Sequence, residues 1–217
     1  MTYLLITGAG MGSRFGGSTP KQFITIDGVE LLKYTIDKFD CIEDKKIYVG
    51  LNKQYIDKFE YKNIIKFIGG DTGQDTIFKG LKTIIENNDI KSDDIIIIQD
   101  GNRPCTSNRI ILNLIDFIKQ NPSELVCPQI PIYGLSSING DKQYNRNEFV
   151  YTQMPCCCNL IELYNLYSKI NNLSLYNNPM EIWCEHKPIK FIKGDLLNIK
   201  ITYPEDLEIL NNLKLLN

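Results

Sequence analysis

The sequence predicts an α/β protein with a mostly parallel sheet flanked by helices, and two patterns indicate this class. Short apolar runs with the length of buried strands alternate with segments whose apolar residues recur at helical spacing. Glycine or polar residues follow three of the predicted strands, as expected where the carboxyl ends of parallel strands carry a binding site. The chain has 217 residues and 43% hydrophobic content, which fits one large domain over residues 1–217.

The N-terminal half contains four predicted strands and two predicted helices. In chain order they are a strand at residues 3–7, a helix at 31–39, strands at 47–49 and 64–68, a helix at 77–85 and a strand at 95–98. The apolar residues of the first helix, Leu31, Leu32, Ile36 and Phe39, recur at helical spacing. The strand at 95–98 consists of isoleucine alone, which is typical of a central parallel strand buried on both faces.

The C-terminal half continues the alternation around one irregular segment. Its predicted elements are a helix from residue 107 to near 122, a strand at 125–130, a helix at 160–170, a strand at 189–192 and a closing helix that starts at 204. Between residues 133 and 146 the apolar periodicity fades, and extended character resumes at 149–152. This pattern predicts a small β-arm excursion over residues 133–152, and exposed arms of this type commonly pair with another subunit.

The charge balance and hydropathy exclude several classes of function. A net charge of -2 argues against a general nucleic-acid binder, whose affinity comes mainly from Lys and Arg that neutralise many phosphates. No apolar run approaches the ~20 residues that span a bilayer, so we expect no membrane partner. The N-terminus does not resemble a signal peptide, and we expect a cytoplasmic protein.

The cysteines predict neither a disulfide framework nor a metal site. Their number is odd and their spacing irregular, at positions 41, 105, 127, 156, 157, 158 and 184, so we expect reduced thiols. Three adjacent cysteines cannot easily aim at one ion, and His186 is the only histidine that could complete a zinc site. With one histidine in the chain, a Ser/His or Cys/His catalytic pair is not expected either.

The strongest functional signal is the stretch GAGMGSRFGGSTPKQ at residues 8–22, directly after the first strand. Glycines without Cβ atoms let backbone N–H groups approach an anion closely. The loop carries Arg14 and Lys21, and the first acidic residue of the chain is Asp27, so a polyphosphate is the expected ligand. Ser13 stands where a dinucleotide fingerprint needs its third glycine, and the loop does not end in the Gly-Lys-Ser/Thr of a Walker A motif.

Three strand ends are expected to meet in one crevice, because ligands of open parallel sheets bind beyond the carboxyl ends of the strands. They are the glycines at 8–12, the turn at 69–76 and the polar residues at 100–103. This topology predicts the site before any family is considered. The Gly-Gly turn at 69–70, taken alone, is better explained as an ordinary connection between a strand and a helix.

At this point the motifs resemble a known family. The GxGxGSRF pattern from residue 8 and the PKQF that begins at residue 20 are similar to the opening signature of the IspD/TarI cytidylyltransferases, which make CDP-alcohols from CTP and a polyol phosphate. Three further motifs match in order: GGD at 69–71 with a threonine at 76, DxxRP at 100–104 and NIKITxPEDL at 198–207. The resemblance implies a Rossmann-like nucleotide-diphospho-sugar transferase fold and a homodimer that pairs through the arm.

The resemblance also implies roles for individual residues. Arg14, Lys21 and Lys200 would be catalytic cations on the phosphate side, and Asp100 would hold Mg²⁺ as the cofactor. The residues implied in CTP binding are Gly8, Ala9, Gly10, Gly12, Ser13, Gly70, Asp71, Thr76 and Asp100. The residues implied in acceptor binding are Arg103, Gln153 and Thr202. The implied reaction is in-line attack of an acceptor phosphate oxygen on the α-phosphorus of CTP, with positioning and charge stabilisation as the main catalytic effects.

Departures from the family pattern cluster on the acceptor side. Gly73 replaces a frequent arginine, QDGNRP at 99–104 replaces HDAARP, GLSS at 134–137 replaces DTxK, and QMPC at 153–156 replaces QTPQ. Our leading hypothesis is therefore a polyol or sugar phosphate acceptor for surface polysaccharide synthesis, such as a capsule or a teichoic-acid-like polymer. The alternative is 2-C-methyl-D-erythritol 4-phosphate, for isoprenoid synthesis.

A non-enzymatic alternative is a catalytically inactive relative that serves as a nucleotide sensor. Such a protein would lose its phosphate-binding charges first. Arg14, Lys21 and Lys200 are all present in this chain, which favours an enzyme over the sensor.

Overall fold

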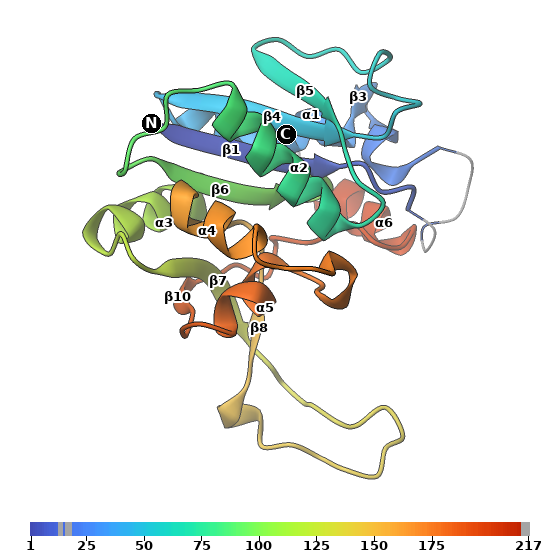
Figure 1. The fold of residues 1–217 in the computed structure, drawn as a ribbon. Coiled ribbons are helices and arrows are strands. Elements are labelled where there is room, and N and C mark those ends of the chain that lie inside the picture. Colours follow the sequence, from blue (N-terminus) through green and yellow to red (C-terminus); the bar gives the residue numbers. More distant parts are fainter. Residues whose placement is uncertain (13–14, 16–18, 214–217) are drawn as a thin grey trace.

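A computed structural model describes residues 1–12, 15 and 19–213 of the chain. Its main feature is an eight-stranded sheet (Figure 1). The strand order is β10 (Lys190–Lys193), β7 (Leu125–Pro131), β9 (Cys156–Asn159), β6 (Ile95–Asp100), β1 (Thr2–Gly8), β4 (Lys45–Leu51) and β5 (Ile64–Ile68), and β8 (Val150–Thr152) pairs with β7. Strands β6, β1, β4 and β5 pair in parallel, as do β10 and β7. The predicted mostly parallel sheet is confirmed.

Helices cover both faces of the sheet because strand side chains alternate between the faces. Tyr3 and Leu5 of β1 point to one face, and Leu4 and Ile6 point to the other. The first face is covered by α2 (Gly73–Glu86), α4 (Leu160–Tyr167) and α5 (Pro179–Cys184), and the second by α1 (Leu31–Asp37) and α3 (Asn108–Gln120). The expected α/β alternation therefore produces a three-layer arrangement with two hydrophobic cores.

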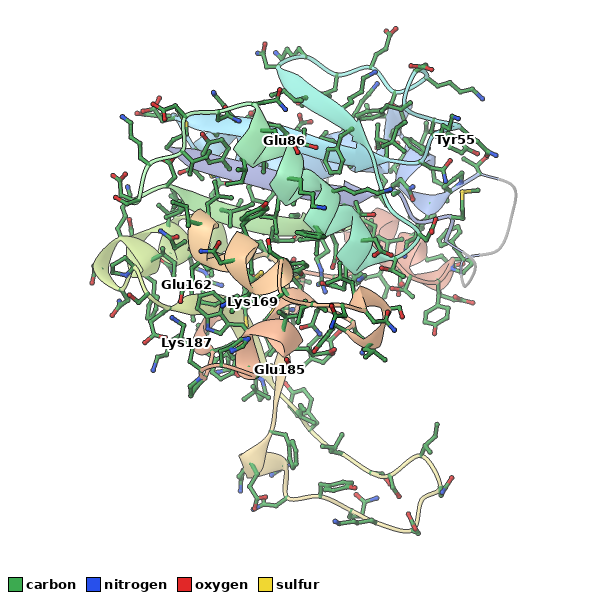
Figure 2. The ribbon with its side chains drawn as sticks, in the orientation of Figure 1. Tyr55, Glu86, Glu162, Lys169, Glu185 and Lys187 are labelled. Carbon is green, nitrogen blue, oxygen red and sulfur yellow. The ribbon has the colours of Figure 1, made fainter. Side chains whose placement is uncertain are left out.

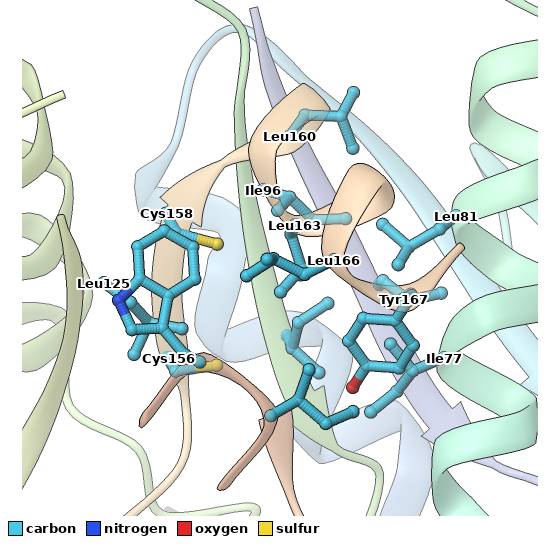
Figure 3. Close-up of a cluster of buried hydrophobic side chains, with 14 of the residues drawn as sticks. Ile77, Leu81, Ile96, Leu125, Cys156, Cys158, Leu160, Leu163, Leu166 and Tyr167 are labelled. Atoms are coloured by element: carbon cyan, nitrogen blue, oxygen red, sulfur yellow. The ribbon is translucent and has the colours of Figure 1, made fainter. Parts of the chain in front are cut away.

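Strand β9 is the main element that the sequence did not predict. It inserts antiparallel between β6 and β7, and its cysteines at 156, 157 and 158 are fully buried. Figure 3 shows Cys156 and Cys158 in the same apolar cluster as side chains from α4, α2 and β6. Burial raises the pKa of the Cys157 thiol far above its usual range. These cysteines therefore act as small apolar residues, which explains why their adjacency carried no strand signal.

The smaller elements adjust several predicted boundaries. The first predicted helix ends at Asp37 and continues as a 3₁₀ turn, η2 (Lys38–Cys41). The closing helix is α6 (Glu205–Leu213), and its Leu210 packs on Leu31 and Ile201. The other short elements are η1 (Lys21–Phe23), β2 (Thr25–Ile26), β3 (Val29–Glu30), η3 (Arg146–Glu148) and η4 (Leu173–Leu175).

The irregular segment between β7 and β8 forms the expected excursion. Figures 1 and 2 show this segment leaving the body of the molecule, with its side chains clear of the rest of the chain. The body itself carries surface ion pairs such as the one between Glu162 and Lys187, both labelled in Figure 2. Within it, residues 136 and 143 form a single antiparallel bridge. Several of its large apolar side chains are exposed: Tyr133, Ile138, Tyr144, Phe149 and Val150. Among the described residues, no helix has the length and apolar character needed to span a membrane.

Candidate active site

The predicted crevice exists at the carboxyl ends of β1 and β6. A cavity of about 350 Å³ is bounded by residues 7–12, 21–22, 70–73, 76, 100–102 and 200. It therefore brings together the glycine loop, the Gly-Gly turn, the end of β6 and the lysine that precedes α6. Predicted site residues that line it are Gly8, Ala9, Gly10, Gly12, Lys21, Gly70, Asp71, Thr76, Asp100 and Lys200. Ser13 and Arg14 lie outside the described residues, so their predicted roles stay predictions.

The glycine loop presents backbone donors to this cavity. Within the described part of the chain, the N–H groups of residues 9–12 donate no hydrogen bond. Unpaired N–H groups are costly unless water or a ligand satisfies them, and a run of them forms an anion site. Gly12 has a φ of +71°, which favours glycine where the loop turns toward Lys21. The loop thus has the chemistry of a phosphate cradle.

The Gly-Gly turn is held by the first turn of α2. Thr72 caps the helix through a reciprocal capping box with Asp75. The Thr76 hydroxyl accepts a hydrogen bond from the Gly70 N–H at 3.0 Å and donates one to the Thr72 carbonyl at 3.0 Å. Thr76 is 1% exposed, so its hydroxyl shapes the turn and leaves the exposed Asp71 at the cavity.

Gly10 permits a test of the cradle that leaves the fold intact. A Cβ atom at Gly10 would meet no atom of the described residues within 4 Å, so Gly10→Ala should change the free energy of unfolding by less than about 0.5 kcal/mol. The added methyl group would occupy the space through which a phosphate approaches the backbone. We expect the KM for a nucleotide substrate to rise about tenfold, a loss of about 1.4 kcal/mol of binding.

The control for this experiment is Gly134→Ala. A Cβ at Gly134 also meets nothing within 4 Å, but this residue lies in the excursion, away from the cavity. Steady-state kinetics and denaturant unfolding of both variants would separate the two effects. An unchanged KM for Gly10→Ala would contradict a ligand at the glycine loop.

At the end of β6, Asp100 joins two cations. Its Oδ2 accepts a hydrogen bond from Arg103 Nε at 2.9 Å, and its Oδ1 accepts one from Lys200 Nζ at 3.1 Å. Burial opposes ionisation of Asp100, but the Lys200 ammonium and the Arg103 guanidinium hold the pKa of its carboxyl below the usual range. The carboxylate therefore stays ionised and orients Lys200 toward the cavity, which both residues line.

A buried polar network fixes the loop that carries Lys200. Asn198, 1% exposed, accepts a hydrogen bond from the Thr106 hydroxyl at 3.0 Å and donates one to the Met154 carbonyl at 2.7 Å. The Asn198 carbonyl accepts a hydrogen bond from Arg103 Nη1 at 2.9 Å. Asn102 donates its side-chain amide to the Ile201 carbonyl. Lys200 is thus held between two anchored neighbours.

The residues predicted to bind the acceptor line a second cavity. Arg103, Gln153 and Thr202 border a space of about 350 Å³ that also reaches Lys200. Lys200 therefore links this space to the first cavity. The Gln153 amide is already occupied, because its Nε2 donates to the Asp195 carbonyl at 2.8 Å and its Oε1 accepts from the Asp195 N–H at 3.2 Å. Gln153 therefore shapes this cavity. The side chains of Arg103 and Thr202 still have hydrogen-bonding groups that a ligand could use.

Comparison with known proteins agrees with this geometry. The sequence model of the family described as IspD, 2-C-methyl-D-erythritol 4-phosphate cytidylyltransferase, matches residues 2–213. The chain belongs to the IspD family. It is a CTP-dependent cytidylyltransferase, as the resemblance of its motifs predicted.

Relatives in the IspD family match nearly the whole chain. The 2-C-methyl-D-erythritol 4-phosphate cytidylyltransferase of Clostridium botulinum (strain 657 / Type Ba4) is 30% identical over 220 residues, which cover 94% of this chain and 93% of the relative. Among solved structures, the Francisella tularensis IspD has a TM-score of 0.82 at 22% identity and covers 97% of this chain and 98% of its own. The bifunctional IspDF of Campylobacter jejuni has a TM-score of 0.81 at 23% identity, over 95% of this chain and 53% of its own. The structural matches establish the fold.

Several of the departures from the IspD pattern point inward, whereas Gly73 lines the first cavity and residues 134–137 lie in the excursion. Gln99, which is fully buried, donates its side-chain amide to Thr106 at 2.8 Å, and Asn102 donates its own to the Ile201 carbonyl next to Lys200. Cys156 is buried in β9. These side chains support the Lys200 loop and do not present free groups to an acceptor. The sequence divergence is therefore weak support for a new acceptor, contrary to the argument behind our leading hypothesis.

The carboxylates present are compatible with Mg²⁺. Among the described residues, no group of three or more His, Cys, Asp and Glu side chains is placed to hold a metal. A phosphate-bound Mg²⁺ requires fewer protein ligands, since one or two carboxylates hold it together with substrate oxygens and water. Asp100 and Asp71 both line the first cavity, and each Asp100 oxygen accepts one hydrogen bond and keeps a further lone pair. This donor set fits a metal ion that arrives with a triphosphate.

Proposed function

We propose that the chain transfers the cytidylyl group of CTP to 2-C-methyl-D-erythritol 4-phosphate for isoprenoid synthesis. The observation that carries this proposal is the match to the IspD family over residues 2–213, joined to a cavity that gathers the phosphate-side residues. Curated relatives with 30% identity are described by the same acceptor. These findings favour the alternative acceptor over the surface-polysaccharide hypothesis, whose main support was the set of departures from the family pattern, several of which face inward.

In this proposal an acceptor phosphate oxygen attacks the α-phosphorus of CTP. The new bond joins that oxygen to the α-phosphorus, and the bond from the α-phosphorus to the bridging oxygen breaks, so pyrophosphate leaves with the bonding electron pair. The acceptor phosphate is already ionised, and no general base is required. Because the reactants are anions, positioning and charge stabilisation supply most of the catalysis.

The residues have separate proposed roles in this reaction. The N–H groups of residues 9–12 and the Lys21 ammonium bind the triphosphate, a task that Arg14 shares in the prediction from the sequence. Lys200, oriented by Asp100, stabilises charge between the two cavities. Gly70, Asp71 and Thr76 form the nucleoside side of the first cavity. Arg103 and Thr202 bind the acceptor, and Gln153 holds the loop at residue 195 that leads to Lys200. Asp100, together with the triphosphate, would hold Mg²⁺, which would supply positive charge.

Pyrophosphate release from CTP across a panel of acceptors tests the proposed function. The panel contains 2-C-methyl-D-erythritol 4-phosphate, ribitol phosphate, glycerol phosphate, hexitol phosphates and sugar phosphates, each with Mg²⁺. We expect kcat/KM for the first to exceed that for every other acceptor by at least about tenfold. Preference for ribitol phosphate or a sugar phosphate would restore the surface-polysaccharide hypothesis. Tight CTP binding with no turnover on any acceptor would favour the nucleotide sensor.

We further propose that residues 1–217 form one nucleotidyltransferase domain and that residues 133–152 are its dimerisation arm. Tyr133 is 72% exposed and Ile138 fully exposed, a large apolar surface for a segment that stands away from the body (Figure 2). Burial of this surface against a second copy would remove the unfavourable exposure of apolar side chains to water. Sedimentation at micromolar concentration should give a dimer, and Ile138→Asp should shift it toward monomer. A wild-type protein that sediments only as a monomer would contradict this assignment.

A further inference from the structure

We propose that Gln22 is a positioning residue that holds the glycine loop in its anion-binding shape. This inference rests on the proposed function, because it concerns the loop assigned to the CTP phosphates. Gln22 follows Lys21 in the short helix η1 and lines the first cavity. In this role it acts through the backbone of the loop, without a bond of its own to the reacting atoms.

The geometry assigns one side-chain nitrogen to two loop carbonyls. Gln22 Nε2 donates to the Gly8 carbonyl at 2.7 Å and to the Gly10 carbonyl at 2.9 Å. Gln22 is 3% exposed; its bond to Gly8 is buried, and its bond to the exposed Gly10 is partly buried. A primary amide carries two hydrogens on one nitrogen, which is the number that this arrangement requires. Gln22 thereby bridges the end of β1 and the start of η1.

Those two bonds determine where the loop donors point. A trans peptide is planar, and its N–H points opposite to its C=O. When Gln22 draws the Gly8 and Gly10 carbonyls toward itself, the N–H groups of Ala9 and Met11 are turned to the other side. Within the described residues these two N–H groups have no acceptor, and both residues line the cavity. The amide thus converts a flexible glycine segment into a preorganised set of donors.

An alternative role for Gln22 is simple burial of a polar side chain. That role would require only that the amide be satisfied somewhere in the interior. Here both bonds go to a segment whose own N–H groups have no acceptor among the described residues. Because glycine loses more conformational freedom on folding than other residues, this segment also gains most from an external clamp. These observations favour a positioning role over a purely structural one.

The first test is Gln22→Met, which keeps a similar side-chain length and removes both donors. We expect kcat/KM for CTP to fall by about 10- to 100-fold, since misplacement of binding groups by about 1 Å has effects of this size. The affinity for pyrophosphate, measured by calorimetry, should fall in parallel, whereas the KM for the acceptor should stay unchanged.

The matched control is Asn88→Leu. The Asn88 side-chain nitrogen also donates two bonds, to the Tyr48 hydroxyl and the Ile84 carbonyl, each at 2.7 Å, but Asn88 lies between α2 and the start of β6, at the opposite end of the strands. It should lower the unfolding temperature without changing the KM for CTP. If Gln22→Met binds CTP and pyrophosphate as well as the wild type, Gln22 does not position the loop.

The second test is Gln22→Glu, which preserves shape and makes donation depend on protonation. An ionised carboxylate donates no hydrogen bond, whereas the neutral acid donates one. The activity of the variant relative to wild type should therefore increase as the pH is lowered, which a packing effect alone would not produce. Other ionisable groups line the same cavity: Lys21, Asp71, Asp100 and Lys200. Dividing the activity of the variant by that of the wild type at each pH cancels the effect of their titration.

The two proposals fail in distinguishable ways. If wild-type protein neither binds CTP nor releases pyrophosphate with any acceptor, the proposed function is wrong. If the wild type is active and the activity ratio of Gln22→Glu does not change with pH, the positioning role of Gln22 is wrong.

Discussion

Lys200→Met is expected to lower kcat by about 10²- to 10³-fold, the effect of removing one preorganised group that stabilises transition-state charge. Lys200 borders both the nucleotide cavity and the acceptor cavity, so its ammonium lies where negative charge from both reactants meets. Its bond to Asp100 and the anchored neighbours at 198 and 201 orient it before substrate binds. Steady-state kinetics with saturating CTP would measure the loss in kcat directly.

The control for this variant is Lys193→Met. Lys193 lies at the end of β10 with an exposed side chain, so the substitution removes the same charge outside the cavities. It should leave kcat unchanged within about twofold, since surface substitutions have small effects. A kcat for Lys200→Met that stays within a few-fold of wild type would show that Lys200 is not a catalytic residue.

Asp100→Asn is expected to destabilise the fold as well as the site. It would leave Arg103, which is 5% exposed, without the carboxylate that balances its charge. Loss of one partner of a buried ion pair costs about 3–5 kcal/mol, and the 17% exposure of the Asp100 side chain favours the lower end. Urea unfolding at neutral pH should report a decrease in the free energy of unfolding of about 3 kcal/mol.

The same pair predicts how stability depends on pH. The pKa of Asp100 is lowered in the folded protein, so its contribution to stability is complete above the unfolded aspartate value of about 3.9 and is lost as the pH falls through the folded value. The stability difference between wild type and Asp100→Asn should therefore be constant from pH 7 to about 5 and shrink below about 4. Asp93→Asn, at an exposed carboxylate, is the control. An undiminished difference at pH 3 would contradict the ion-pair explanation.

Much of the fold follows from local patterns along the chain. The isoleucines at 95–98 predicted a buried central strand, and β6 occupies the middle of the sheet with parallel β1 on one side. Its other neighbour, β9, runs antiparallel and was not predicted. Three cysteines show neither the alternation nor the β-branched residues that mark a strand, and their pairing depends on contacts about 30 and 60 residues away in the chain.

Part of the site could likewise be predicted from the sequence, and part could not. Glycine spacing, the Gly-Gly turn and the polar end of β6 predicted one crevice, because parallel strands place their carboxyl ends at a common edge. The cavity confirms that these segments meet. The importance of Gln22 was missed, although PKQF was recognised as a motif. The only sequence signal was a glutamine two residues after Pro20. Its role could not be predicted because the carbonyls that accept its hydrogen bonds lie 12 and 14 residues earlier in the chain.

The sequence by itself determined the α/β class and the family, and it predicted phosphate binding at residues 8–22, since these depend on residue type and short spacing. Only the tertiary structure decided what Gln99, Asn102 and Gln153 do. From the sequence, Gln99 and Asn102 looked like altered contacts with an acceptor and Gln153 like a retained one. In the fold, Gln99 donates to the Thr106 hydroxyl, and Asn102 and Gln153 donate to the backbone carbonyls of residues 201 and 195. A polar side chain can serve a ligand or the protein interior, and the choice depends on which partner the folded chain brings within about 3 Å.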